Sequence, residues 1–202
     1  MGGSSRPVNS DVVPLFVFMK QFFLLALFFI SCATLNAQTV TPFTGLERQV
    51  KSQGGWGGPK EPLAREFNAE RKRLGNRFET ELLKYVGTDV ERHYWTSALL
   101  EDAGYLQGSA PLPHLSLLLK QQALALLDGK RDEDSLMNIV MLAVTAAVLA
   151  QRLHLHPLAV SYKTTAQSLI DRDPDLGGAF PALYPEERKM YDAIVVSRTK
   201  TF

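Results

Sequence analysis

Residues 136–150, LMNIVMLAVTAAVLA, are the stretch that decides the fold. Only Asn138 and Thr145 are polar within it. A helix of this length reaches about 22 Å, which is too short for the ~30 Å hydrocarbon core of a bilayer. A helix that is apolar on all sides is typically buried inside a protein. The stretch therefore predicts a central helix over about residues 133–153, wrapped by other helices.

The alanines of this region predict a close helix pair. Four of them form a stripe that permits close approach of a neighbouring backbone, namely Ala143, Ala146, Ala147 and Ala150. In the next segment the spacing of Ala159 and Ala166 resembles the second helix of a tetratricopeptide-like hairpin. No second copy appears at the period that such repeats need. The resemblance therefore covers one hairpin at most, and the alanine stripe predicts close approach of a neighbouring helix.

Helical periodicity continues outward from this hairpin. On its N-terminal side, apolar residues recur at steps of three, four and seven, which is the spacing of one helix face: Leu63, Phe67, Leu74, Phe78, Leu82 and Tyr85. This stripe predicts one long helix that Gly87 ends, and Thr88 and Glu91 form a capping box for the next. Further helices are predicted over about residues 88–103, 113–127, 157–171 and 186–196. Six helices with short links indicate an all-α fold, either an antiparallel bundle or a stack of helical hairpins.

The composition fits one ordinary globular domain. The chain has 202 residues, of which 46% are hydrophobic and 21% charged. Lys and Arg number 22 against 21 Asp and Glu, so net charge gives no reason to expect nucleic acid as a partner. A single cysteine excludes a scaffold built on internal disulfides.

The N-terminal region resembles an export signal. Met19 and Lys20 precede an unbroken apolar run over residues 22–30, and Ala37 stands before Gln38. We expect cleavage after Ala37, with residues 1–18 an over-extended gene start. An uncut membrane anchor would need ~20 apolar residues, more than twice the length of this run. A lipid on Cys32, which follows Ser31 as in a bacterial lipobox, is the alternative.

Cleavage would leave a neutral chain without cysteine. The remaining 165 residues carry 20 basic and 20 acidic side chains. Thiol catalysis is thereby excluded, and we expect the product in the periplasm or medium, or tethered to the envelope through Cys32. Residues 38–60 are rich in Gly and Pro and predict a flexible leader, with Trp56 a loose anchor on the domain surface. Residues 61–202 are expected to form a single helical domain.

The helix predicted over residues 88–103 contains the candidate catalytic residues. Asp102 falls on its apolar face near the C-terminal end, where the helix dipole disfavours a carboxylate. Such a group either pairs with a cation or serves a function. An enzyme of this chain would be a small hydrolase that uses Asp102 or Glu101 together with His93 or His114.

The same helix contains the candidate binding residues. Aromatic and ionisable side chains are densest there, in His93, Tyr94, Trp95 and Tyr105. Trp and Tyr recur as binding anchors because they offer large contact areas with few rotors. On helical geometry Tyr94 and Trp95 are expected in the core, and His93 is expected on the opposite, exposed side.

Two segments resemble metal sites without completing one. Asp171, Asp173 and Asp175 have calcium-loop spacing, but Leu176 stands where the loop needs glycine and Ala182 where it needs Glu. His154 and His156 have no third ligand at a nearby spacing. We therefore predict no metal and no cofactor.

These observations favour a binding or scaffolding module outside the cytoplasmic membrane. Its partner would be an unknown protein or envelope polymer and not a nucleic acid. Membrane contact is expected only through the export signal or a lipid on Cys32. The small hydrolase is the alternative from another class.

Overall fold

The computed structural model describes residues 41–101 and 110–196. The chain divides into two units, residues 1–41 and residues 42–202. All of the described helices belong to the second unit. Within the described residues there are eight α-helices and no strand, which confirms the all-α prediction. The helices are α2 (Thr44–Ser52), α3 (Lys60–Leu74), α4 (Phe78–Val86), α5 (Val90–Glu101), α6 (Pro113–Leu126), α7 (Glu133–Arg152), α8 (His156–Arg172) and α9 (Pro185–Ala193). Two short 3-10 helices, η1 (Gly75–Arg77) and η2 (Pro174–Ala179), complete the set.

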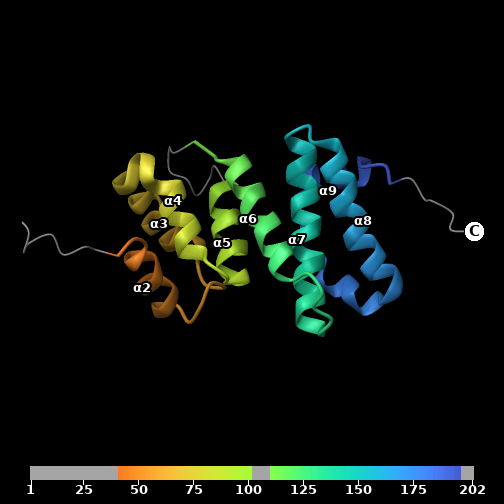
Figure 1. Ribbon diagram of the computed structural model, residues 1–202, viewed down its shortest axis with the longest axis horizontal. Coiled ribbons are helices and arrows are strands. Elements are labelled where there is room, and N and C mark those ends of the chain that lie inside the picture. Colours follow the sequence, from red (N-terminus) through yellow and green to blue (C-terminus); the bar gives the residue numbers. More distant parts are fainter. Residues whose placement is uncertain (1–40, 102–109, 197–202) are drawn as a thin grey trace, which may run out of the picture. The chain divides into compact units, whose positions relative to one another are not determined.

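Neighbours in sequence are mostly neighbours in space. Helix α6 packs against α5 on one side and α7 on the other, and α7 packs along α8 (Figure 1). Helix α9 and η2 also contact α7. Helix α7 is thus the element with the most packing partners.

Helix α7 is the central buried helix that its composition predicts. Asp132 caps its N-terminus by accepting a hydrogen bond from the Ser135 N–H at 2.9 Å. Along the helix, Val140, Leu142 and Val144 are fully buried. Among the described helices α7 has the length and composition to cross a membrane, yet most of its apolar window is buried inside the protein. Burial against α6, α8 and α9 accounts for its apolar character.

The alanine stripe forms the α7–α8 contact. All four alanines of the stripe are fully buried, and they share one cluster with Ala159 and Ala166 of α8. Small side chains let the two backbones approach closely over the length of the pair. The neighbouring backbone that the alanine stripe accommodates is that of α8.

The prediction of a single long helix before Gly87 is wrong, because the region contains α3, η1 and α4. Its apolar stripe is buried as expected from Leu63 to Leu82. However, Gly75 adopts φ 51°, which a helix cannot accommodate, and η1 separates α3 from α4. Asp89, and not Thr88, then caps α5, because its carboxylate accepts a hydrogen bond from the Arg92 N–H at 3.0 Å.

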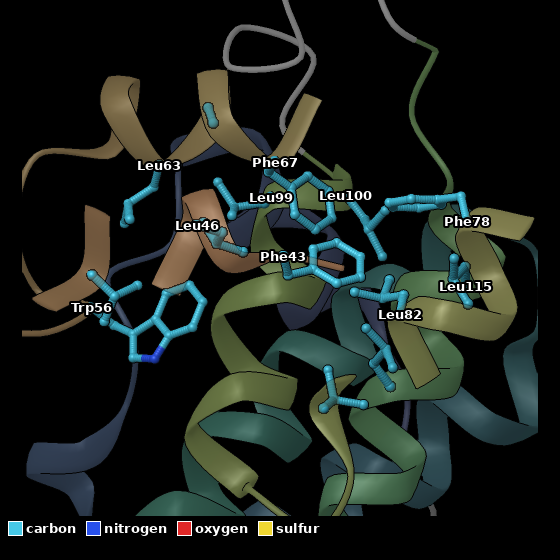
Figure 2. Packing of buried hydrophobic residues seen from close by; sticks show 14 of the residues in the cluster. Phe43, Leu46, Trp56, Leu63, Phe67, Phe78, Leu82, Leu99, Leu100 and Leu115 are labelled. Carbon is cyan, nitrogen blue, oxygen red and sulfur yellow. The ribbon is translucent and has the colours of Figure 1, made fainter. Parts of the chain in front are cut away.

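The flexible leader predicted over residues 38–60 is also corrected. Residues 44–52 form helix α2, and Phe43 just before it is fully buried. The Phe43 ring stacks on Tyr85 with centroids 4.6 Å apart and lies among Leu46, Phe67 and Leu100 (Figure 2). Trp56 is only 5% exposed, at one end of the same cluster, so it is a core residue and not a loose anchor (Figure 2). The difference arises because this segment also contains apolar residues, such as Leu46 and Trp56, and their burial in the cluster stabilises an ordered structure.

Several predicted features lie outside the described residues. These are the export signal over residues 1–37, Cys32, Asp102 and Tyr105.

Candidate functional site

A cleft of about 620 Å³ lies between helices of residues 42–202. Its walls come from the start of α3, one face of α5, Lys120 of α6, the second half of α7 and residues 181–187. Small-molecule sites in proteins typically measure about 300–1,000 Å³. The cleft is therefore large enough for a small ligand.

Aromatic side chains line this cleft. Tyr94 and Trp95, adjacent on α5, meet edge to face with ring centroids 5.0 Å apart. Both are half-buried, so the prediction that they fill the core is only partly right. Trp56 contributes a third ring, and Tyr184, 68% exposed, a fourth at the opposite wall. Trp56 is almost fully buried, so the rings that can supply contact area for an apolar ligand are those of Tyr94, Trp95 and Tyr184.

A buried ion pair stands at the wall formed by α5 and α6. Lys120 Nζ lies 3.0 Å from Glu101 Oε1 and donates a hydrogen bond to Ser97 Oγ at 2.9 Å. The Ser116 hydroxyl donates to the same carboxylate oxygen at 2.6 Å. Lys120 is 2% exposed, so this pairing offsets the cost of taking its ammonium out of water. Glu101 lines the cleft in this paired state.

Tyr94 lies beside this ion pair. Lys120 Nζ is 5.8 Å from the centroid of its ring. Burial, and then the nearby Glu101 carboxylate, raise the pKa of Tyr94. The phenol of this cleft residue therefore stays neutral at neutral pH.

Lys60 sits at the first turn of α3, over the face of Trp95. Its Nζ is 3.2 Å from the centroid of the Trp95 ring and donates a hydrogen bond to the Trp56 carbonyl at 2.9 Å. Burial lowers the pKa of Lys60. Among the described residues no carboxylate lies within ion-pair distance of this ammonium. The Lys60 ammonium therefore contacts an aromatic ring and a carbonyl oxygen, and not a carboxylate of the described residues.

The opposite wall holds a second ion pair. Arg152 Nη2, near the end of α7, lies 3.0 Å from Glu187 Oε1 in α9. The other Glu187 oxygen accepts a hydrogen bond from the Tyr184 N–H at 3.1 Å. Glu187 thus fixes the start of α9 against α7 and is compensated in charge.

Ser97 and Lys120 have the contact distance of a serine–lysine nucleophile pair. Ser97 is fully buried, however, and does not line the cleft. The Ser97 hydroxyl donates to the Tyr94 carbonyl at 2.6 Å and accepts a hydrogen bond from Lys120 at 2.9 Å, so its proton points to a carbonyl and not to the amine. This pair therefore serves the helix contact.

The histidines proposed from sequence do not meet Glu101 in the cleft. His93 was expected to be exposed but is 1% exposed, with its Nδ1 2.7 Å from the Asp89 carbonyl oxygen. The expectation is wrong because α5 packs on both faces, against α6 and against the N-terminal helices. His114 is exposed at the start of α6 and does not line the cleft. Of the three catalytic candidates that the structure describes, Glu101 lines the cleft and His93 and His114 do not, while Asp102 lies outside the described residues.

The residues considered as metal ligands have local structural roles. Asp173 accepts a hydrogen bond from the Asp175 N–H at 3.1 Å and so caps η2, while Asp171 accepts from Gln167 at 2.8 Å. His156 contacts Gln151, and His154 adopts φ 60° at the α7–α8 turn. Across residues 41–101 and 110–196, no three His, Cys, Asp or Glu side chains converge on a metal-sized site.

The sequence did not predict most of the cleft wall, including its other four charged residues and its most exposed ring: Lys60, Lys120, Arg152, Glu187 and Tyr184. For Lys120 a signal was present, because it continues a stripe with Ser116, Ala123 and Leu127 at steps of four, three and four, and all four are buried. A lysine on such a stripe must meet a buried acid. The others come together from distant segments and leave no local pattern.

No family model, curated protein or solved structure matches this chain.

Proposed function

We propose that the protein is an exported binding module that holds a small amphipathic molecule in the cleft between α3, α5, α7 and α9. The observation that carries this proposal is a space of about 620 Å³ whose lining includes three partly exposed aromatic side chains, Tyr94, Trp95 and Tyr184. Its titratable groups are paired with each other or with rings, as suits a site that holds a ligand. The carboxylate–histidine hydrolase receives no support from Glu101, since neither candidate histidine lines the cleft.

Binding is tested with three naphthalene compounds that share a ring and differ in end group: naphthylacetate, naphthylethanol and naphthylethylamine. Isothermal titration should detect binding of at least one. Ala98→Trp places a large ring into the cleft from α5, where Ala98 is half-buried, and should abolish binding. Ala125→Trp on the exposed face of α6 is the matched control and should bind as the parent does.

A second variant guards against misfolding of Ala98→Trp. Tyr184→Ala removes a ring that is 68% exposed, so the fold should persist while affinity falls. The proposal is overturned if none of the three compounds binds. It is also overturned if Ala98→Trp, shown to be folded by circular dichroism, binds as tightly as Ala125→Trp.

The export part of the proposal rests on the Lys20 and apolar-run pattern of the sequence. The chain expressed in a bacterial host should be recovered without its first 37 residues. Intact mass decides between three products: the trimmed chain, a chain acylated on Cys32, and the uncut chain. The uncut mass would contradict export by cleavage.

A further inference from the structure

We infer that the ligand of this cleft carries one carboxylate, which pairs with Lys60. The inference rests on the proposed function, because it assigns chemistry to the same site.

Among the described residues, the cleft wall has one more cation than it has carboxylates. The wall contains the cations Lys60, Lys120 and Arg152 and the carboxylates Glu101 and Glu187. Lys120 holds Glu101 at 3.0 Å, and Arg152 holds Glu187 at 3.0 Å. Among the described wall residues, Lys60 is the cation without an acid. A ligand with one negative charge would neutralise the wall.

The geometry of Lys60 leaves its ammonium able to accept such a partner. An ammonium has three N–H donors. One donates to the Trp56 carbonyl at 2.9 Å, and the charge faces the Trp95 ring at 3.2 Å. A further donor remains for a ligand oxygen. Lys60 is half-buried, so an ion pair formed there is less screened by water than one on the open surface.

The surroundings of Lys60 select the rest of the ligand. Trp95 and Tyr94 lie directly beside it on α5, and Leu63 is one turn further along α3. Leu63 is only 1% exposed, so an apolar ring or chain attached to the carboxylate would contact the half-buried Trp95 and Tyr94. The ligand class is therefore an aromatic or aliphatic monocarboxylate.

The three naphthalene compounds separate this inference from the proposed function. Naphthylacetate should bind at least about tenfold tighter than naphthylethanol, because a charge-assisted hydrogen bond is added to the same ring contact. Naphthylethylamine should bind most weakly, since its ammonium faces Lys60. Lys60→Met should remove the difference between the three compounds. Lys72→Met, an exposed lysine of the same helix outside the cleft, is the charge-matched control and should keep the difference.

Salt supplies a second measurement that needs no variant. The advantage of naphthylacetate over naphthylethanol should shrink as salt rises to about 1 M, because ions screen the pair. Equal binding of all three compounds that Ala98→Trp abolishes would overturn the carboxylate inference and leave the binding module standing. Tightest binding of the amine, or an advantage of naphthylacetate that neither salt nor Lys60→Met reduces, would also overturn it. Absence of any binding would overturn both.

Discussion

Lys120 and Glu101 form an ion pair of unequal burial, with the lysine side chain 2% exposed and the glutamate side chain 19% exposed. The lysine cannot reach water when its partner is removed, whereas the glutamate can. The two ends of the pair are therefore expected to respond differently to substitution.

Glu101→Gln should destabilise the protein by about 3–5 kcal/mol, because it leaves an uncompensated ammonium in the core. Lys120→Met, which fills a similar volume without charge, should cost less. The double variant should recover stability relative to Glu101→Gln alone. Urea unfolding of the four proteins measures this cycle, and equal losses for the two single variants would contradict it.

His93→Ala should lower stability by about 2 kcal/mol or more, since it empties a buried site next to the Asp89 carbonyl. The sequence predicts His93 to be exposed, and an exposed histidine would give a much smaller loss. Diethylpyrocarbonate labelling gives an independent check of burial. In the folded protein His114, His154 and His156, which are exposed, should react before His93. Equal reactivity of all four would contradict the packing of α5.

Ala146→Leu should destabilise the α7–α8 pair by about 1–3 kcal/mol through overpacking. Ala146 is fully buried in the alanine stripe, so an added isobutyl group must separate the two helices. Ala125→Leu on the exposed face of α6 is the control and should change stability by about 0.5 kcal/mol or less. Comparable losses in the two variants would argue against close packing of the stripe.

Tyr85 should make stability fall at high pH. An unfolded tyrosine ionises near pH 10. In the folded chain burial, followed by the hydrogen bond to Glu47, raises the pKa of Tyr85. Above about pH 10 the unfolded chain therefore releases this proton first, and the folded state loses relative stability.

The Tyr85→Phe variant tests this assignment. It keeps the ring that stacks on Phe43 and removes the proton. Its free energy of unfolding should drop less between about pH 8 and pH 11 than that of the parent. An identical drop would place the pH dependence elsewhere.

Lys163 should hold the C-terminal end of α9 in place. Its Nζ donates hydrogen bonds to the carbonyls of Tyr191 at 2.8 Å and Ile194 at 2.9 Å, where a cation also meets the helix dipole. Lys163→Met should cost about 1 kcal/mol and speed proteolysis after residue 185. Lys189→Met, which removes an exposed pair with Glu186, should leave the cleavage rate unchanged.

Residues 136–150 determined the fold class and the central helix without any tertiary information. A helix that is apolar on all sides is stable in a globular protein only when other elements bury it. Its alanines allow the backbone of a neighbouring helix to pack close to it. Gly87 and Pro113 likewise marked helix ends that the structure confirms, because each restricts the backbone locally.

Tertiary structure alone decided the cleft and the exposure of α5. Lys60, Lys120 and Arg152 are separated by tens of residues and meet the same space only after the helices pack. His93 is buried although periodicity predicts it to be exposed, and it lies on a helix that packs along α6 and also contacts α4. Periodicity reports how a helix divides its own surface, whereas burial depends on how many partners that surface meets, and this number is a property of the packed chain.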